Sequence, residues 1–406
     1  MKTKVAMMFG GKTVEHEVSV ISGIQAIMAM DTDKYEVIPV YLTKENEMYT
    51  GSDIGDISAY RDIPALLKRS QRVIMVNEGG RVQLVPYPSK MFGAKPVQID
   101  IAFPVVHGTN VEDGALQGYL KTLGVPFVGP DVTSSAISMD KYITKAVLKD
   151  AGVPVLDARV YTLADYAKMD SLIDDAEEVV GYPLIVKPVN LGSSVGIGLA
   201  KNRDELIQAL DDAFMYATRV LIEHAVTELR EINCAVLGDE NEAEASECEE
   251  PLTSGEILSY EDKYVNGGGG KKGGAKGGSG SKGAGMANLS RKIPADLSPE
   301  KREEIREMAV RAFKALGCNG VSRIDFIIDK AGGELYFNEI NPIPGSLSFY
   351  LWEPVGVPYG ELLDRMIQLA LKRMRTEEAL TFTFDTNILA NADLGGGKQG
   401  RQKDSR

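Results

Sequence analysis

The sequence predicts two or three packed domains: an α/β unit on a doubly wound parallel sheet, followed by α+β units. Three observations predict this fold class. The 406 residues are too many for one compact core. Short apolar runs alternate with helical patterns through the first third, as in parallel sheets. The later segments mix strands and helices less regularly and end in two adjacent strands.

The first third supplies the elements of the parallel sheet. Its apolar runs predict strands at Val5–Phe9, Val37–Leu42 and Asp100–Val106, and its helical patterns predict helices at Ser19–Met30 and Ala115–Leu123. Folds of this kind bind ligands in the loops that follow the carboxyl ends of their strands. Two such loops, Gly10–Glu17 and His107–Gly114, hold notable polar residues, so we expect them to face a ligand.

Two further units follow. The second opens near Ser138, where Ser138 or Asp140 caps a helix that runs to Lys149. It continues with strands at Leu184–Lys187, Gly196–Ala200 and Val220–Glu223 and a helix at Arg203–Ala217. The third unit has a strand at Glu231–Leu237, a helix that begins at Ser298 and runs over Pro299–Leu316, and two final strands.

Between Val265 and Ser290 the composition changes sharply to Gly, Lys, Ser and Ala, which cannot bury a core. The segment is either a dispensable linker or a mobile lid. We favour a lid, because motifs flank it closely and loops of this length are often functional. The last residues, from about Asn391, are polar and Gly/Lys-rich and predict a disordered tail.

Composition excludes several classes of protein. The formal net charge of −13 argues against a nucleic-acid surface. No apolar run approaches the ~18 residues that a membrane span needs, and Val5–Phe9 is too short for a signal segment. The three cysteines lack metal-binding spacing, which fits a reducing cytoplasm. With three histidines, a His-rich zinc site is not expected.

Residues 323–341 carry the strongest chemical pattern. Ser322–Asp329 and Glu334–Asn341 read as the two strands of a β-hairpin with a glycine turn. A register that pairs Asp325 with Glu339 also pairs Arg323 with Asn341, and all four side chains then share one face. The alternative is an exposed polar face with a salt bridge. The apolar neighbours favour a buried site, and its oxygen ligands suit Mg²⁺.

A Gly/Ser-rich loop follows the strand that ends at Lys187. The residues from Asn190 to Gly198, with Gly192, Ser193 and Ser194, would let backbone N–H groups approach an anion. The charge of Lys187 could meet a phosphate there. This loop is not a Walker A motif, because it contains no GK[ST] and no helix starts directly after it; Gly11–Thr13 ends like one, but Ala6 stands where its first glycine belongs. On its own, it predicts a plain turn and a phosphate loop equally well.

The motifs stand in one order along the chain. They are Gly10–Ser19, His107–Gly114, Asp140–Lys141, Val186–Pro188, Gly192–Gly196, Asp262–Tyr264, Arg323–Asp325, Glu339–Asn341 and Pro344–Gly345. As an ordered set over residues 4–385, they resemble the D-alanine–D-alanine ligase family of the ATP-grasp superfamily. The resemblance implies an ATP-grasp fold with ATP clamped between two α+β subdomains.

The resemblance also implies residue roles. Asp325, Glu339 and Asn341 would hold Mg²⁺ or Mn²⁺, with two ions expected. ATP would contact the phosphate-side residues Lys141, Lys187, Ser193 and Ser194, the adenine hinge Glu223, His224 and Val226, the ribose ligand Glu231, and Lys263. Glu15 would bind the ammonium of the first D-alanine, near His107. Ser193 and Tyr264 would link with Glu15 and close the lid. Lys263 and the segment after Pro344, including Tyr350 and Leu351, would handle the second D-alanine.

The implied reaction has two steps. The carboxylate of the first D-alanine attacks the γ-phosphate of ATP, and the amine of the second D-alanine attacks the acyl phosphate. Arg323 and the backbone N–H of Gly345 would stabilise the oxyanion. A closed lid would exclude water from the reactive intermediate. The Lys263–Tyr264 pair argues for D-alanine as acceptor, since relatives that use D-lactate usually lack it.

Three positions depart from the family pattern: Val111 replaces a glycine, Pro342 a threonine, and Tyr350–Leu351 a Ser–Leu pair. The last departure leaves the acceptor open, with D-lactate or D-serine as alternatives. His107 reads equally well as a packing histidine and as an acid–base group. A nucleotide-binding protein without chemistry is a further alternative, although it should have lost Glu15, Arg323 or a metal ligand.

We expect four regions. An N-terminal domain spans 1–137, a central subdomain 138–222, a C-terminal subdomain 223–390 with a mobile lid at 260–292, and a tail 391–406. The substrates would be small molecules, D-alanine and ATP. The resemblance implies a homodimer, and no nucleic acid or membrane partner is expected.

Overall fold

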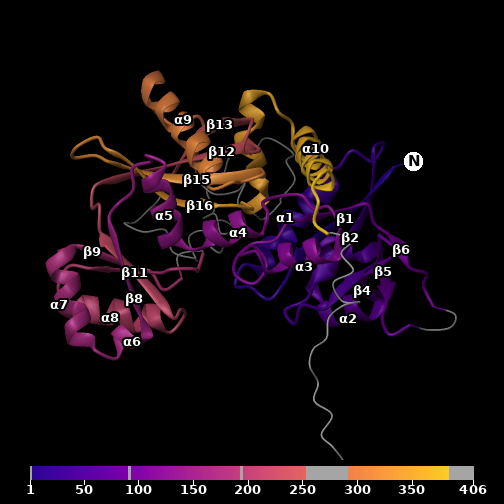
Figure 1. Cartoon of the computed structure of the whole chain (residues 1–406), viewed down its shortest axis with the longest axis horizontal. Coiled ribbons are helices and arrows are strands. Elements are labelled where there is room, and N and C mark those ends of the chain that lie inside the picture. The colour runs from indigo at the N-terminus through magenta and orange to yellow at the C-terminus, as the bar shows by residue number, and fades with distance from the viewer. Residues whose placement is uncertain (1, 90–92, 193–194, 253–290, 384–406) are drawn as a thin grey trace, which may run out of the picture.

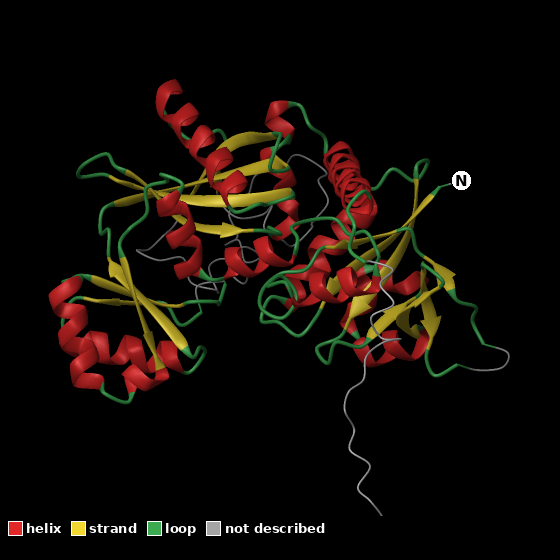
Figure 2. Ribbon diagram, viewed as in Figure 1, coloured by secondary structure: helices red, strands yellow, loops and turns green. Residues whose placement is uncertain are grey.

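The computed structural model describes residues 2–89, 93–192, 195–252 and 291–383. The Gly/Lys-rich part of the predicted lid and the predicted tail lie outside these residues. Three sheets organise the described chain, with seven, four and five strands. Figures 1 and 2 show them in three lobes, with the four-stranded sheet and its helices set apart from the other two.

The N-terminal sheet has the strand order β6-β5-β4-β3-β2-β1-β7. Its strands are β1 (Thr3–Gly10), β2 (Tyr35–Leu42), β3 (Met48–Thr50), β4 (Gln71–Glu78), β5 (Arg81–Pro86), β6 (Val97–Gln98) and β7 (Ile101–Pro104). The helices are α1 (His16–Ala29), η1 (Ser52–Gly55), η2 (Ile57–Arg61), α2 (Ile63–Arg69) and α3 (Ala115–Leu123). The predicted parallel pairing holds for β2, β1 and β7, and β3 to β6 add an antiparallel half that the sequence analysis did not predict.

The chain then crosses to the other sheets through α4 (Val132–Met139) and α5 (Lys141–Asp150). Asp140 caps α5 by accepting hydrogen bonds from the backbone N–H groups of Tyr142 and Ile143, as predicted. The four-stranded antiparallel sheet follows, with α6 (Leu163–Tyr166), α7 (Met169–Val179) and α8 (Arg203–Phe214) packed on it. Its strands are β8 (Ala158–Thr162), β9 (Leu184–Pro188), β10 (Gly198–Ala200) and β11 (Arg219–His224).

The C-terminal sheet has the order β14-β13-β12-β15-β16. These strands are β12 (Leu229–Gly238), β13 (Ala243–Pro251), β14 (Arg291–Lys292), β15 (Gly320–Asp329) and β16 (Leu335–Asn341). The remaining helices are α9 (Pro299–Ala315), capped by Ser298 as predicted, η6 (Gly345–Leu351), η7 (Glu353–Val355) and α10 (Tyr359–Glu378).

Alternation along β12 divides the C-terminal sheet into two faces. Ile232, Cys234 and Val236 belong to a core shared with α5 and α9. Ala235 and Leu237 belong instead to the core of the N-terminal sheet, which also takes in η6 and α10. The second face of the C-terminal sheet is therefore turned toward the N-terminal unit, and polar residues on that face meet the loops of the N-terminal sheet.

The helix α10 completes the N-terminal core although it ends the described chain. Leu362, Leu363, Met366 and Ile367 are buried with the side chains of β1. Arg373 donates hydrogen bonds to the carbonyls of Gly129 and Phe127 at 2.7 and 2.6 Å. These contacts join the two ends of the chain into one packed unit, with α10 between that unit and the C-terminal sheet (Figure 1).

Candidate active site

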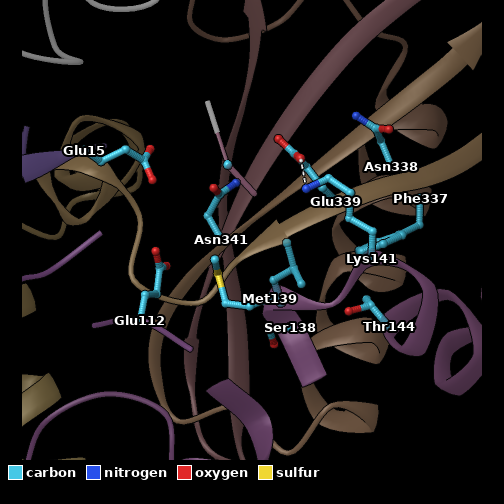
Figure 3. A pocket seen from close by; sticks show the side chains of 12 residues that line it. Glu15, Glu112, Ser138, Met139, Lys141, Thr144, Phe337, Asn338, Glu339 and Asn341 are labelled. Atoms are coloured by element: carbon cyan, nitrogen blue, oxygen red, sulfur yellow. Dashed lines mark ion pairs between the residues drawn. The ribbon is translucent and has the colours of Figure 1, made fainter. Parts of the chain in front are cut away.

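A pocket lies where the three sheets approach one another (Figure 3). The N-terminal loops supply Glu15 and Glu112, and the α4–α5 junction supplies Ser138, Met139, Lys141 and Thr144. Gly192 and β16, from Phe337 to Asn341, complete the lining. In Figure 3, Glu15 and Glu112 lie on one side of the pocket, Lys141 and Glu339 lie on the other, and Asn341 lies between them. The pocket thus joins the predicted donor, phosphate and metal residues.

The two predicted N-terminal loops fix Glu15. The amide of Asn110 donates to the carbonyl of Lys12 at 2.9 Å, which ties one loop to the other. Gly108 has a φ of +85°, and a Cβ there would lie 2.7 Å from Oε2 of Glu15. A side chain at position 108 would therefore displace the carboxylate. The departure at Val111 has a steric explanation, since its methyl group fills the space that Gly11 leaves open.

Glu112 lies beside Glu15 and is almost fully buried. Its two carboxylate oxygens accept hydrogen bonds from the backbone N–H groups of Gly108, at 2.7 Å, and Ile343, at 2.8 Å. Burial raises the pKa of Glu112 to about 8, and the charge of Glu15 adds to the rise. Glu112 joins the N-terminal loop to the segment after β16. Glu112 belongs to the predicted loop His107–Gly114, but the resemblance implied no role for it.

The hairpin of β15 and β16 has the predicted register. Asp325 pairs with Glu339 and Arg323 with Asn341, and a bulge follows Asp325. Arg323 donates to Asp325 through Nε and Nη2, both at 2.7 Å, and the amide of Asn341 donates to Asp325 at 3.3 Å. Although burial opposes its charge, Asp325 holds the pKa of Arg323 well above its usual value. The four groups therefore meet on one face, as predicted.

The donor set of this hairpin suits a divalent cation. Two carboxylates and one amide oxygen come from adjacent strands, and oxygen donors are those that Mg²⁺ and similar hard cations prefer. Among the described residues, no three His, Cys, Asp or Glu side chains gather as a metal site. That finding is consistent with the prediction, because its third ligand is an asparagine. The residues fit the cation that the sequence analysis expected.

Two of the three lysines at the site pair with one buried carboxylate. Nζ of Lys187 lies 2.5 Å and Nζ of Lys145 lies 2.6 Å from Glu223. Burial alone would raise the pKa of Glu223, but the two lysines lower it to about 2. Lys187 also donates to the pocket residue Asn338 at 3.1 Å. Lys141 lies at the pocket itself, 3.7 Å from Glu339.

The predicted hinge residues mark the crossing between two sheets. Glu223 and His224 end β11, Val226 lies in the connection, and Glu231 follows in β12. Glu223 is buried and His224 is exposed. In this structure Glu223 neutralises lysines, a contact that the sequence analysis did not foresee. Lys145 was missed with it, although Lys141 and Lys145 are four residues apart and share a helix face.

The geometry around His107 favours the packing interpretation. Its Nδ1 lies 2.8 Å from the carbonyl of Ile343 and its Nε2 lies 2.9 Å from the hydroxyl of Ser22. A carbonyl oxygen only accepts, so Nδ1 carries the proton and Nε2 accepts from Ser22, whose oxygen also accepts from the backbone N–H of Ser346. Burial lowers the pKa of His107. A neutral ring with both nitrogens engaged holds the loops in place.

Gly345 begins η6, a turn with unusual backbone geometry. Ser346, Leu347 and Ser348 have φ values of 52°, 51° and 49°, in the left-handed region that L residues avoid. Packing holds them there, since all three are buried and Ser346 donates to Gln25 at 2.8 Å. The turn positions two predicted substrate residues, Tyr350 beside the polar face and Leu351, fully buried in the core.

Four predicted site residues, Ser193, Ser194, Lys263 and Tyr264, lie outside the described residues. Two further residues near the site, Glu249 on β13 and Arg291 on β14, were not singled out from the sequence. Arg291 Nη1 donates to Glu249 at 2.7 Å. No sequence motif contains both residues of this pair, because they lie on either side of the Gly/Lys-rich segment.

Two antiparallel sheets that meet at a pocket with buried lysines, paired carboxylates and a guanidinium define an ATP-grasp ligase. Profiles described as the D-ala D-ala ligase N-terminus and C-terminus match residues 4–130, and residues 147–273 and 281–368. The chain therefore belongs to the D-alanine–D-alanine ligase family. It is an ATP-dependent ligase of a family that acts on small molecules and uses divalent metal ions.

Individual relatives agree over nearly the whole chain. The D-alanine–D-alanine ligase of Caldicellulosiruptor bescii is 40% identical over 390 residues, which cover 94% of this chain and 99% of the relative. The solved D-alanine–D-alanine ligase of Coxiella burnetii is similar with a TM-score of 0.74 at 28% identity, over 93% and 96% of the two chains. The VanG D-Ala:D-Ser ligase of Enterococcus faecalis has a TM-score of 0.74 at 29% identity, over 91% and 100%.

Proposed function

We propose that the chain joins two D-alanine molecules at the expense of ATP for cell-wall peptidoglycan synthesis. The observation that carries the proposal is the shared face of Arg323, Asp325, Glu339 and Asn341, which meets Glu15 and Lys141 at one pocket. Named relatives support it, because those of Caldicellulosiruptor bescii and Coxiella burnetii are D-alanine–D-alanine ligases by name.

Glu15 would bind the ammonium of the donor D-alanine, held in position by the close approach of Gly108 and Gly192. The donor carboxylate would then point toward β16. Lys141 reaches into the same pocket, and Lys187 contacts its lining at Asn338. These cations would hold the phosphates of ATP while the donor carboxylate attacks the γ-phosphoryl group.

Asp325, Glu339 and Asn341 would hold Mg²⁺, or Mn²⁺ in its place, and we propose two ions. A cation bound there would spread the negative charge of the transferring phosphoryl group. In the chain itself, Arg323 orients Asp325 through two hydrogen bonds of 2.7 Å. The ligand is therefore preorganised before any cation binds.

Arg323 and the backbone N–H of Gly345 would stabilise the oxyanion that forms when the acceptor amine attacks the acyl phosphate. The left-handed turn after Gly345 supports this role, because a backbone held rigidly by packing loses little freedom during the reaction. Removal of one such donor usually costs about 3–4 kcal/mol in the barrier. The predicted lid, with Lys263 and Tyr264, would exclude water.

D-serine is the second candidate acceptor. The similarity to the VanG D-Ala:D-Ser ligase and the phenol at Tyr350 favour testing it. The intact Lys263–Tyr264 pair supports D-alanine over D-lactate. We further propose that the protein is a homodimer in the cytoplasm. Within each chain, we place the domain boundaries near residues 137, 222 and 390. Cys234, Cys248 and Cys318 are free thiols, which is consistent with that compartment. In the described chain, no helix could cross a membrane.

Purified protein should be incubated with ATP, MgCl₂ and D-alanine, with phosphate release followed beside dipeptide formation by mass spectrometry. D-serine, D-lactate and L-alanine would run in parallel, with Arg323→Ala as the control. We expect D-alanyl-D-alanine and an equal amount of phosphate from the wild type and neither from the control. No phosphate release with any acceptor would overturn the proposed function.

A further inference from the structure

Three charged side chains from three elements form one buried cluster beside the active-site pocket. Nζ of Lys187, on β9, lies 2.5 Å from Oε1 of Glu223, on β11, and Nζ of Lys145, on α5, lies 2.6 Å from Oε2. The side chains of Lys145, Lys187 and Glu223 are 5%, 9% and 1% exposed. We call these three residues the Glu223 cluster. One buried carboxylate thus has a separate lysine at each of its two oxygens.

The strand register brings Lys187 and Glu223 to the face of their sheet that lies away from its own helices. Leu221 pairs directly with Lys187 across β11 and β9, and Glu223 follows Leu221 by two residues. Lys187 and Glu223 are therefore diagonal neighbours on one face, within reach of each other's side chains. The alternate residues Val186 and Ile222 turn to the other face, into the core with α7 and α8.

The two lysines of the cluster differ in their access to the pocket. Nζ of Lys187 also donates to Oδ1 of Asn338 at 3.1 Å, and Asn338 lines the pocket. Among the described residues, Thr144 lines the pocket but the next residue, Lys145, does not. Within the same part of the chain, neither Nζ of Lys145 nor Oε2 of Glu223 has a well-aligned hydrogen bond. Lys187 can therefore reach a ligand in the pocket, while Lys145 and Glu223 attract each other as an ion pair with unused hydrogen-bonding capacity.

The proposed reaction requires Lys187 to change partners. Lys187 contacts Glu223 in this structure, whereas the proposed function has it hold a phosphate of ATP. An ammonium group that moves toward a phosphate in the pocket must weaken its contact with a carboxylate on the neighbouring strand. A buried charge that loses its only partner is strongly destabilised. Without a second cation, that destabilisation would weaken the binding of ATP.

Lys145 avoids this cost because it already contacts the carboxylate. Burial lowers the pKa of Lys145, Glu223 raises it, and the positive charge of Lys187 lowers it. When Lys187 moves toward a phosphate, its repulsion of Lys145 weakens, so the pair between Lys145 and Glu223 becomes stronger. The carboxylate of Glu223 then keeps a counter-ion throughout the exchange.

We propose that Lys145 is a positioning residue that replaces Lys187 as the counter-ion of Glu223 when Lys187 binds the phosphates of ATP. This inference rests on the proposed function, in which Lys187 contacts those phosphates. It gives a task to a buried lysine that the proposed reaction does not otherwise use. It also explains why one carboxylate is paired with two lysines: one cation leaves for the substrate and the other remains.

The next turn of α5 provides a matched control. Nζ of Lys149 lies 2.6 Å from Oδ1 of Asp157, the same distance as in the buried pair of Lys145 and Glu223. The side chains of Lys149 and Asp157 are 68% and 89% exposed, and exposed pairs contribute little to stability. Lys149→Met therefore makes the same chemical change on the same helix without uncovering a buried carboxylate. It should leave ATP binding unchanged.

Isothermal titration measures the affinity of the full-length protein for ATP in MgCl₂, in the absence of D-alanine. We expect Lys145→Met to raise the Kd for ATP by about 10- to 100-fold, the range for a lost charge-assisted hydrogen bond. Lys145→Arg keeps a cation at this position and should recover most of that loss. In steady-state kinetics, the KM for ATP should rise in Lys145→Met while the KM for the donor D-alanine stays within about twofold of the wild type.

A double-mutant cycle separates this role from a direct contact between Lys145 and ATP. In a Glu223→Gln background no carboxylate needs a counter-ion, so Lys145→Met should change the Kd for ATP by less than about twofold. An equal loss of affinity in both backgrounds would mean that Lys145 binds ATP itself, and would overturn the inference. A folded Lys145→Met variant with the Kd of the wild type would also overturn it.

Circular dichroism checks that each variant folds. Should Lys145→Met fold poorly, Lys145→Gln carries the same cycle, because it removes the charge and keeps a polar group beside Glu223. A wild type that binds ATP and forms no dipeptide would overturn the proposed ligase function, whereas the titrations would still decide the role of Lys145.

Discussion

Glu223 balances the charges of two buried lysines, and Glu223→Gln removes that balance. The shift of its pKa from 4.5 to about 2 corresponds to about 3.4 kcal/mol at 1.36 kcal/mol per unit. Breaking a buried pair generally costs about 3–5 kcal/mol. We expect the lower end of that range, because burial already lowers the pKa of Lys145, so this lysine can release its proton instead of remaining charged without a partner.

Scanning calorimetry at pH 7 checks this expectation. A loss of ~3 kcal/mol corresponds to a midpoint about 6–12 °C lower for a cooperative unit of ~150–250 residues. Glu223→Gln combined with Lys145→Met should recover part of that loss. The control is Asp174→Asn, which removes an exposed partner of Arg203 and should leave the midpoint unchanged. A single variant that melts within about 1 °C of the wild type would show that Glu223 does not compensate the lysines.

The remaining predictions concern the pocket. Arg323→Lys keeps the charge but loses the two-pronged contact with Asp325; we expect kcat to fall by about 10²–10³-fold, and steady-state kinetics with an unchanged kcat would contradict the proposed oxyanion role. Gly108→Ala places a methyl group against Glu15 at a φ of +85°. We expect the KM for the donor D-alanine to rise more, relative to the wild type, than the KM for ATP. Isothermal titration with unchanged donor affinity would refute the steric argument. Glu112 has its pKa raised to about 8, so its contribution to stability is complete below pH 4.5 and is lost as pH rises through 8. Thermal midpoints should fall over that window less steeply in Glu112→Gln than in the wild type, and parallel slopes would count against the raised pKa.

Alternation along strands made the metal hairpin predictable. Pairing Asp325 with Glu339 determines the register of the hairpin, and that register also pairs Arg323 with Asn341. A slip by one residue would turn the side chains of one strand to the opposite face of the sheet. The two shortest strands in the antiparallel half of the N-terminal sheet were not predictable in the same way. β3 and β6 have only three and two residues, and such short strands are defined by pairing with neighbours and not by their own sequence pattern.

The contacts of the site were harder to predict than its residues. Lys187 was expected at the phosphates, yet no pattern along the chain indicated that Glu223, on the neighbouring strand β11, would pair with it and with Lys145 from α5. Arg291 and Glu249 meet through the pairing of β13 with β14. These encounters depend on how sheets and helices pack in three dimensions, which periodicity along one strand cannot reveal.

The position of α10 has a consequence for how the protein is made. The ribosome releases the N-terminal sheet early, but Leu362, Leu363 and Met366, which cover part of its core, come near the end of the described chain. Synthesis from Leu123, at the end of α3, to Tyr359, at the start of α10, takes roughly 10–50 s at ~5–20 residues per second. During that interval the nascent first unit exposes an apolar surface that its own last helix will later cover. Fragments that stop before α10 should therefore aggregate or bind chaperones, even though every strand of the first sheet is present.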